Sequence, residues 1–233
     1  MALFLPKRQF THGPPVVAYL GQAANGAFIG TSRLAFRGIS AGANGTGNLG
    51  VLNNNKLIVG CISHNSGAAA VAASINGRLA PVYGVTAGAA GIALFCTLVP
   101  DEGLAPIVDV RYASAPSGTP NLSLWSIVGL SSPIPRNIAV SNLAGADTVR
   151  TVDVDSEVDG VIVAMAANNV TAAQSCAWTG DQTPTELIDA AAGGGLYSSA
   201  MIQGTNADAA NTLTATFAVI STTGIGLLAA AFR

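Results

Sequence analysis

Four acidic residues stand at every second position, namely Asp153, Asp155, Glu157 and Asp159. On a β-strand, side chains two residues apart point to the same face, so these carboxylates would gather there. Carboxylate oxygens are the ligands that calcium prefers, although the spacing differs from that of the EF-hand loop. The alternative is a solvated strand face, or a charged edge that discourages unwanted strand pairing. The ladder is therefore a candidate metal site, and both interpretations stay open.

Two glycine-rich motifs resemble catalytic or cofactor signatures. Gly38-Ile39-Ser40-Ala41-Gly42 matches the nucleophile elbow of hydrolases, which needs a strand before it, a helix after it, and then an acid and a histidine. His64 is the later histidine, but no acidic residue lies between it and Ser40. Gly45-Thr46-Gly47-Asn48-Leu49-Gly50 matches the dinucleotide fingerprint, yet the first acid after it is Asp101 rather than one about twenty residues on. We expect neither a catalytic site nor a bound cofactor.

Aromatic side chains could form a stacking platform for carbohydrate. Trp125 lies in the apolar run Leu124-Trp125-Ser126-Ile127 and is expected in the core. Trp178 precedes Thr179-Gly180-Asp181, which favours exposure, and Tyr197 is a second stacking candidate. Glycan hydrolysis would need two carboxylates on either side of the scissile bond. No such pair is recognisable in the sequence, and pairing of distant acids in space stays open.

The three cysteines, Cys61, Cys96 and Cys176, are far apart and flanked by apolar or small residues. An odd number argues against a complete disulfide framework. The spacing lacks the paired C-x-x-C pattern of zinc sites. We expect buried thiols that act as small hydrophobic side chains.

Charge is scarce in this chain: 9% of its 233 residues are charged, and the formal net charge is −2. An average soluble domain carries about 25% charged residues. Without a basic stripe we expect no nucleic-acid partner. A surface so poor in charge predicts burial against other subunits, hence a homo-oligomer. The amino-terminal segment lacks the order of a secretory signal, and no run is long and apolar enough for membrane insertion. We therefore expect synthesis and folding in a cytoplasm.

Short apolar runs alternate with clusters of Gly, Asn, Pro and Ser, which is typical of strands and turns. The runs are 33–37, 56–62, 71–75, 78–83, 92–99, 107–112, 122–130, 137–142, 148–154, 160–166, 174–178, 196–203, 212–220 and 225–232. Asn76-Gly77 between two of these runs predicts a type I′ hairpin. The links are too short for crossover helices, so antiparallel pairing follows. Thr185–Ala192 is the one segment that favours a short helix, with Thr183 as its N-cap.

These elements predict an all-β fold, an antiparallel two-sheet β-sandwich or jelly-roll-like domain with at most one short helix. By composition, residues 1–30 form an amino-terminal arm, a possible particle anchor, and residues 31–233 a single β-sandwich domain. No repeat of fixed period is apparent.

Four segments carry a resemblance to a known family: Ser74-Ile75-Asn76-Gly77-Arg78-Leu79-Ala80, the run from Ala93 to Pro100, the run from Ser123 to Ser132 and the final Gly226–Arg233. They resemble small β-sandwich virion proteins of tailed bacteriophages. The resemblance covers residues 57–233. It implies a non-enzymatic structural protein of the virion, of tail-fibre, tail-tip or head-decoration type, which contacts other virion proteins and the host surface. The alternative is a carbohydrate-binding module that recognises cell-surface glycan through Trp178 and Tyr197.

Overall fold

The protein is all-β and antiparallel, as predicted. The computed structural model describes residues 15–24, 27–29, 33–36, 56–64, 69–84, 90–99, 107–114, 120–170, 175–192, 195–221 and 224–233. Within these residues every regular element is a strand, and each strand pairs antiparallel with its neighbours. None of the described residues belongs to a helix that is long and apolar enough to cross a membrane.

The amino-terminal half of the chain builds two sheets. Sheet A contains, in spatial order, β1 (Val16–Ala24), β10 (Asn121–Val128), β4 (Lys56–His64), β8 (Gly91–Val99) and β7 (Val82–Tyr83). Sheet B contains β2 (Ala27–Ile29), β3 (Arg33–Phe36), β9 (Val108–Tyr112), β5 (Ala70–Ile75) and β6 (Arg78–Ala80). The chain passes repeatedly between the two sheets, so that each sheet contains strands distant in sequence.

The carboxy-terminal half builds two more sheets. Sheet C contains β11 (Asn137–Leu143), β18 (Ile225–Phe232), β13 (Gly160–Asn168), β16 (Gly195–Thr205) and β15 (Thr185–Ala192). Sheet D contains β12 (Asp147–Ser156), β17 (Asp208–Ser221) and β14 (Cys176–Gly180).

The two halves have the same topology. Strands β1, β3, β4, β5, β7, β8, β9 and β10 correspond in chain order to β11 through β18. Under this correspondence sheets A and C have identical strand orders, and β3-β9-β5 of sheet B matches β12-β17-β14 of sheet D. Strands β2 and β6 are additions at the two edges of sheet B. The structure therefore reveals a repeat of topology where the sequence has no repeat of fixed period.

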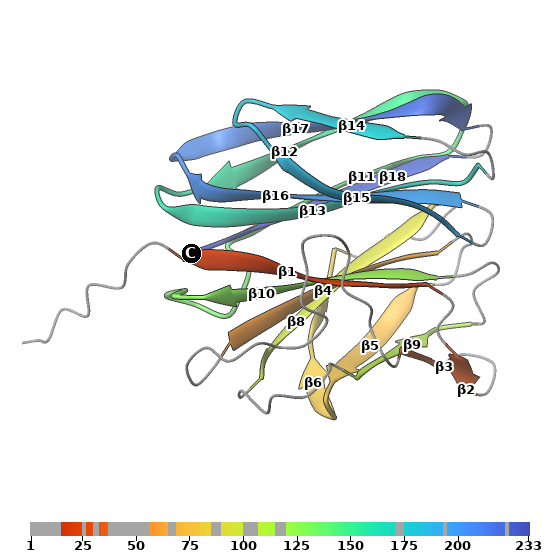
Figure 1. Ribbon diagram of the computed structural model, residues 1–233, viewed down its shortest axis with the longest axis horizontal. Coiled ribbons are helices and arrows are strands. Elements are labelled where there is room, and N and C mark those ends of the chain that lie inside the picture. Colours follow the sequence, from red (N-terminus) through yellow and green to blue (C-terminus); the bar gives the residue numbers. More distant parts are fainter. Residues whose placement is uncertain are drawn as a thin grey trace, which may run out of the picture.

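The four sheets stack face to face in the order B, A, C, D, with sheet D at the top of Figure 1 and sheet B at the bottom. Three hydrophobic cores separate them. The B–A core includes Ile58, Phe95, Leu124, Val110 and Tyr112. The A–C core includes Val59, Leu94, Trp125, Met165, Tyr197 and Leu228. The C–D core includes Ile162, Ile202, Trp178, Leu213 and Phe217. The predicted sandwich packing is confirmed, but it occurs in each half, so four sheets are present where two were expected.

Burial patterns follow from this stacking. Strand β12 alternates exposed and buried residues, because sheet D has one face in water. Strands β13 and β18 are buried along their whole length, because sheet C is covered on both faces. Gly226 of β18 lies against Ala90 and Ile92 of the amino-terminal half. A Cβ placed there would meet the backbone oxygen of Ala90 at 2.5 Å, so the close approach requires glycine.

The hairpin predicted at Asn76-Gly77 is confirmed. Both residues have positive φ, 50° and 75°, as a type I′ turn requires. Asn76 also fastens the turn to β9, because its backbone nitrogen donates to the oxygen of Ile107 (2.8 Å) and its Oδ1 accepts from the Ile107 nitrogen (2.7 Å).

Two predictions about elements were wrong. The segment Thr185–Ala192, expected as a helix, is strand β15, which pairs with β16 along the edge of sheet C with a bulge between Glu186 and Ile188. The run 78–83, expected as one strand, is divided at Pro81, because β6 belongs to sheet B and β7 to sheet A. In both cases pairing with an adjacent strand of the chain decided the local conformation.

The predicted arm, residues 1–30, overlaps strand β1. This strand pairs with β10 from Val16 to Ala24, and its Val17 and Leu20 are buried in the cores. Residues 1–14 lie outside the described residues. That residues 31–233 form a single domain stays a prediction, and the A–C core that joins the two halves is consistent with it.

Candidate functional site

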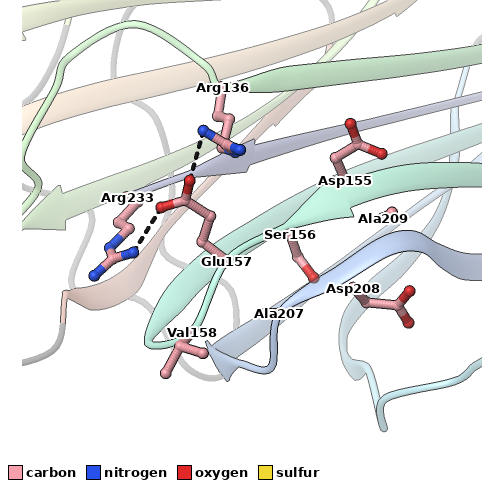
Figure 2. Close-up of a pocket in the computed structure, with 9 residues that line it drawn as sticks. All are labelled: Arg136, Asp155, Ser156, Glu157, Val158, Ala207, Asp208, Ala209 and Arg233. Carbon is pink, nitrogen blue, oxygen red and sulfur yellow. Dashed lines mark hydrogen bonds and ion pairs between the residues drawn. The ribbon is translucent and has the colours of Figure 1, made fainter.

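An open hollow lies at the strand ends of sheets C and D, where β12 turns into β13. It is an open cavity of about 500 Å³. Its lining comes from four chain segments: Arg136; Asp155, Ser156, Glu157 and Val158; Ala207, Asp208 and Ala209; and Arg233. Figure 2 shows that Arg136 and Arg233 approach Glu157 from one side, while the carboxylates of Asp155 and Asp208 point away from it.

Two arginines hold the carboxylate of Glu157. Its Oε1 lies 2.5 Å from Nη1 of Arg136, and its Oε2 accepts from Nη1 of Arg233 at 2.7 Å. The hydrogen bond from Arg233 is the main reason why the pKa of Glu157 lies below its ordinary value, and the charge of Arg136 acts in the same direction. Glu157 is therefore ionised at neutral pH and is the common partner of two permanent cations.

Backbone hydrogen bonds place these side chains. In the β12–β13 turn, Asp159 has a φ of 59°, and the backbone oxygen of Glu157 accepts from Gly160 N (3.1 Å) and Thr205 Oγ1 (2.5 Å). The nitrogen of Arg136 donates to the oxygen of Ala231 at 2.9 Å, which brings the start of β11 beside the end of β18. The start of β11 therefore lies beside the end of β18, and Arg136 and Arg233 both reach Glu157 although the three residues are far apart in sequence.

The charged groups of this cavity form a charge clamp, that is, the ion pairs of Glu157 with Arg136 and Arg233. Arginine does not titrate near neutral pH, and Glu157 has the lowered pKa of an ion-paired acid rather than the raised pKa of a general acid. Ser156 donates its hydroxyl to the backbone oxygen of Asn206 at 2.8 Å, so its proton is already used in holding the turn. The arrangement ties the β12–β13 turn to the ends of β11 and β18.

The acidic ladder does not lie on one strand face. Asp153 and Asp155 are exposed on the outer face of sheet D, whereas Glu157 and Asp159 follow the end of β12 in the turn. Asp153 Oδ1 accepts from Thr212 Oγ1 at 3.0 Å, and Glu157 is engaged by the arginines. Across the described residues, no three acidic, histidine or cysteine side chains come together in a geometry that could hold a metal ion. The expectation that four carboxylates share a face was therefore wrong.

The two candidate stacking residues are buried and separated. Trp178 is 8% exposed in the C–D core, where its Nε1 donates to Ser198 Oγ at 2.7 Å. Tyr197 is 1% exposed in the A–C core, on the opposite face of sheet C. Neither ring presents a face to a ligand, so the expected exposure of Trp178 was wrong. Trp125 is fully buried, as predicted.

The cysteines are free and buried, as predicted. Burial raises the pKa of Cys61 strongly and raises the pKa of Cys96 and of Cys176 to about 12 in each case. A thiol with so high a pKa remains protonated at neutral pH and is a poor nucleophile.

Both glycine-rich motifs, Gly38–Gly42 and Gly45–Gly50, lie outside the described residues, as does His12. His64 is the last residue of β4, and its backbone pairs with Gly91 of β8.

Sequence reasoning did not identify Arg136 and Arg233 as the partners of Glu157. A faint signal was available, because arginine is rare in this chain and Arg136 immediately precedes the strand run 137–142. The strand order that brings the ends of β11 and β18 together could not be read from the sequence.

Comparison with known proteins identified no relative of this chain. No protein-family model matches the chain, no curated protein matches it in sequence, and no solved structure matches its fold.

Proposed function

We propose that this protein is a non-enzymatic structural component of a bacteriophage particle, associated with the tail or its fibres or decorating the head. It assembles with copies of itself and with other virion proteins, and is exposed where it can contact the host surface. The sequence resemblance to phage β-sandwich proteins motivates the assignment to a virion, which is made in the host cytoplasm. The assembly itself is argued from the molecular surface.

The observation that carries the proposal is a row of small neutral side chains across the outer face of sheet D, on which Asp153 and Asp155 are also exposed. On the outer face of sheet D, Thr151, Thr214 and Thr179 stand side by side on three adjacent strands, and Thr151 Oγ1 lies 2.9 Å from Thr214 Oγ1. Ala177 and Ala218 are exposed on the same face. The centres of protein interfaces are depleted of charge, because burying an unpaired charge is costly. The neutral row of this sheet face is suited to burial against another subunit.

A non-enzymatic role is supported by the chemistry of the described residues. The thiols are buried and protonated, and Glu157 is ionised and clamped. The alternative function, a glycan-binding module, finds no support in Trp178 and Tyr197, since both are buried in different cores. Such a module would have to use other residues.

The test is to purify phage particles that encode this chain and count its copies against the major capsid protein by quantitative mass spectrometry. A ratio close to that of the capsid protein assigns the chain to the head surface. A few copies per particle assign it to the tail, its tip or a fibre. Absence from washed particles would overturn the proposal, and binding to a panel of host glycans would then test the alternative.

A further inference from the structure

Strand β12 lies at an edge of sheet D, where side chains cap both of its ends. Among the described strands it pairs with β17 alone. The nitrogen of Val149 donates to Asp147 Oδ1 at 3.1 Å, and the nitrogen of Asp155 donates to Asn137 Oδ1 at 3.3 Å. Backbone groups bonded in this way are not available to a further strand. Capping of a sheet edge by side chains limits unwanted strand pairing.

The middle of the same edge is open. The oxygen of Thr212 accepts from the nitrogen of Asp181 at 3.1 Å, so Thr212 and, by alternation, Thr214 bond to β14 rather than to β12. Their partners in the β12–β17 register are Asp153 and Thr151. These two residues of β12 therefore direct their N–H and C=O groups away from β17. The result is a three-residue window between the caps, with two donors and two acceptors for an added strand.

The amino-terminal half shows the equivalent edge occupied. The counterpart of β12 is β3, and β2 pairs with it over the three residues Ala27–Ile29. Strand β2 comes from the link between β1 and β3. The equivalent link between β11 and β12 consists of residues 144–146, which is too short to supply a strand. The place beside β12 is therefore open to a segment from elsewhere.

The charges beside the window favour a basic occupant. Asp153 and Asp155 are exposed on the outer face of sheet D, and the described residues provide no ion pair for either carboxylate. Opposite charges on directly opposed residues stabilise the pairing of two strands, and like charges oppose it. A second copy of β12 would add aspartates to this face, so it is a poor occupant.

This chain has a basic segment before β1. Residues 1–14 contain two basic residues and no acidic residue. The basic pair begins the run Lys7–Thr11, which lies between Pro6 and Gly13. Breakers at both ends of a run are typical of a short extended segment. The run is long enough to fill a three-residue window.

The position of β1 brings this segment out at the end of the stack where β12 finishes. The nitrogen of Val17 lies 3.4 Å from Oε1 of Gln203, and Gln203 pairs with Val161 at the start of β13. Pro14 and Pro15 come immediately before β1. Consecutive prolines favour an extended backbone, which directs the segment away from its own strands and towards another copy.

We propose that Lys7–Thr11 of one copy adds to β12 of a second copy as an antiparallel strand, in the place that β2 takes beside β3. The inference rests on the proposed function, because it specifies how that function's self-assembly is built. The added strand exchanges backbone hydrogen bonds with Thr151 and Asp153, and Lys7 or Arg8 stands opposite Asp153. Each copy gives one segment and receives one, so the contact closes into a ring or continues as a filament.

Sedimentation velocity of the full chain over a range of concentrations tests the backbone contact. Thr151→Pro removes the outward N–H without removing a bond to β17, as proline at a sheet edge can do. It should weaken self-association by about tenfold or more. Thr151→Val is the matched control, since it loses the same hydroxyl and its contact with Thr214 but keeps the N–H, and should associate like the wild type. Circular dichroism and thermal melting verify that both variants are folded.

Charge reversal tests the occupant independently. Asp153→Lys, and Lys7→Glu together with Arg8→Glu, should each weaken association by about tenfold. A chain with all three substitutions should associate more strongly than either parent variant, because the attraction is restored with reversed signs. Raising NaCl from about 0.05 M to about 1 M should weaken association of the wild type, because the Debye length falls to about 3 Å.

A wild-type chain that remains monomeric at low salt would overturn the inference, as would a folded Thr151→Pro variant that associates like the wild type. A triple variant no stronger than its parents would exclude the basic segment as the occupant. Particle counting decides the proposed function separately. A chain found in virions but monomeric loses the strand exchange and keeps its role, and a chain that associates but is absent from virions does the reverse.

Discussion

Trp178 of β14 in sheet D contacts sheet C through its buried indole ring and through one hydrogen bond to β16. The indole packs in the C–D core and its Nε1 donates to Ser198 Oγ, which is fully buried on β16. Trp178→Ala should lower the free energy of unfolding by about 3–5 kcal/mol, the usual cost of removing a large buried aromatic side chain. Trp178→Phe keeps most of the ring and leaves the Ser198 hydroxyl without this donor, at a cost of about 1–3 kcal/mol.

Chemical denaturation with far-ultraviolet circular dichroism measures both changes. Thr179→Ala, at the exposed neighbouring position, is the control and should stay within about 0.5 kcal/mol of the wild type. A Trp178→Ala variant as stable as this control would contradict the burial described here.

Glu157 makes stability depend on pH. Its folded-state pKa lies below its ordinary value of 4.5, so the stabilisation from Arg233 and Arg136 is complete above pH 4.5 and is lost as the pH falls through the folded-state pKa. Glu157→Gln should therefore melt at a lower temperature than the wild type at about pH 7, and the difference should shrink towards about pH 3.

Melting curves of both proteins across this range give the answer. Asp155→Asn removes an exposed carboxylate for which the described residues show no ion pair, so it should leave the neutral-pH melting temperature nearly unchanged. A constant difference between wild type and Glu157→Gln at every pH would mean that the ion pairs contribute nothing.

Single residues were predicted well where the reason was local. The buried environment of Trp125 and of the cysteines follows from their apolar neighbours in sequence. The burial of Trp178 was not predicted, because the residues that follow it, Thr179, Gly180 and Asp181, are exposed. The ring itself faces the core, since the side chains of β14 alternate between the two faces of sheet D. The clamp on Glu157 could not be predicted, since Arg136 and Arg233 reach it through strand ends that are adjacent only in the folded chain.

At the hairpin between β5 and β6, the free-energy cost of a left-handed backbone can be measured without steric contacts of a new side chain. Gly77 has a φ of 75°, and a Cβ added there would meet nothing within 4 Å. Gly77→Ala should therefore destabilise the protein by about 1–2 kcal/mol through left-handed backbone strain alone. Gly77→Asn should cost less, because asparagine tolerates this region better than alanine. Equal stabilities of the two variants in urea unfolding would show that the turn relaxes to another type.

Elements were predicted from alternation and turn residues, and most of the strands lie where those patterns indicated. The exceptions have one cause. Thr185–Ala192 has the composition of a short helix, yet its backbone groups are satisfied by β16, and the nitrogen of Cys176 on β14 donates to Asp189 Oδ2 at 2.8 Å. Pairing with β16 within sheet C outweighed a local helix preference, which is weak in a segment so short.

The number of sheets had a signal in the sequence. In a two-sheet sandwich each sheet keeps one face in water, so its strands alternate between apolar and polar residues. The runs 56–62, 160–166 and 225–232 are instead almost continuously apolar, which is typical of strands covered on both faces. Several such strands require inner sheets, and sheets A and C are these. The same burial accounts for part of the low charge of the chain.

Because one core joins the halves, the molecule should unfold as a unit. The A–C core packs Trp125 and Leu94 of sheet A against Met165 and Leu228 of sheet C, with no solvent layer between the sheets. We expect a single calorimetric transition whose van't Hoff and calorimetric enthalpies agree. Val110→Ala in the B–A core and Trp178→Ala in the C–D core should both lower the midpoint of that one transition. Two separate transitions, each moved by one substitution, would mean that the halves are independent.

Two topologically equivalent units on one polypeptide differ in principle from a dimer of identical units. In a symmetric dimer every substitution appears twice, so both outer faces necessarily have the same residues. The covalent link between β10 and β11 removes that constraint, and sheet B has the additional edge strands β2 and β6. Broken symmetry of this kind lets the two outer sheets diverge, so the two ends of the molecule need not bind the same partner.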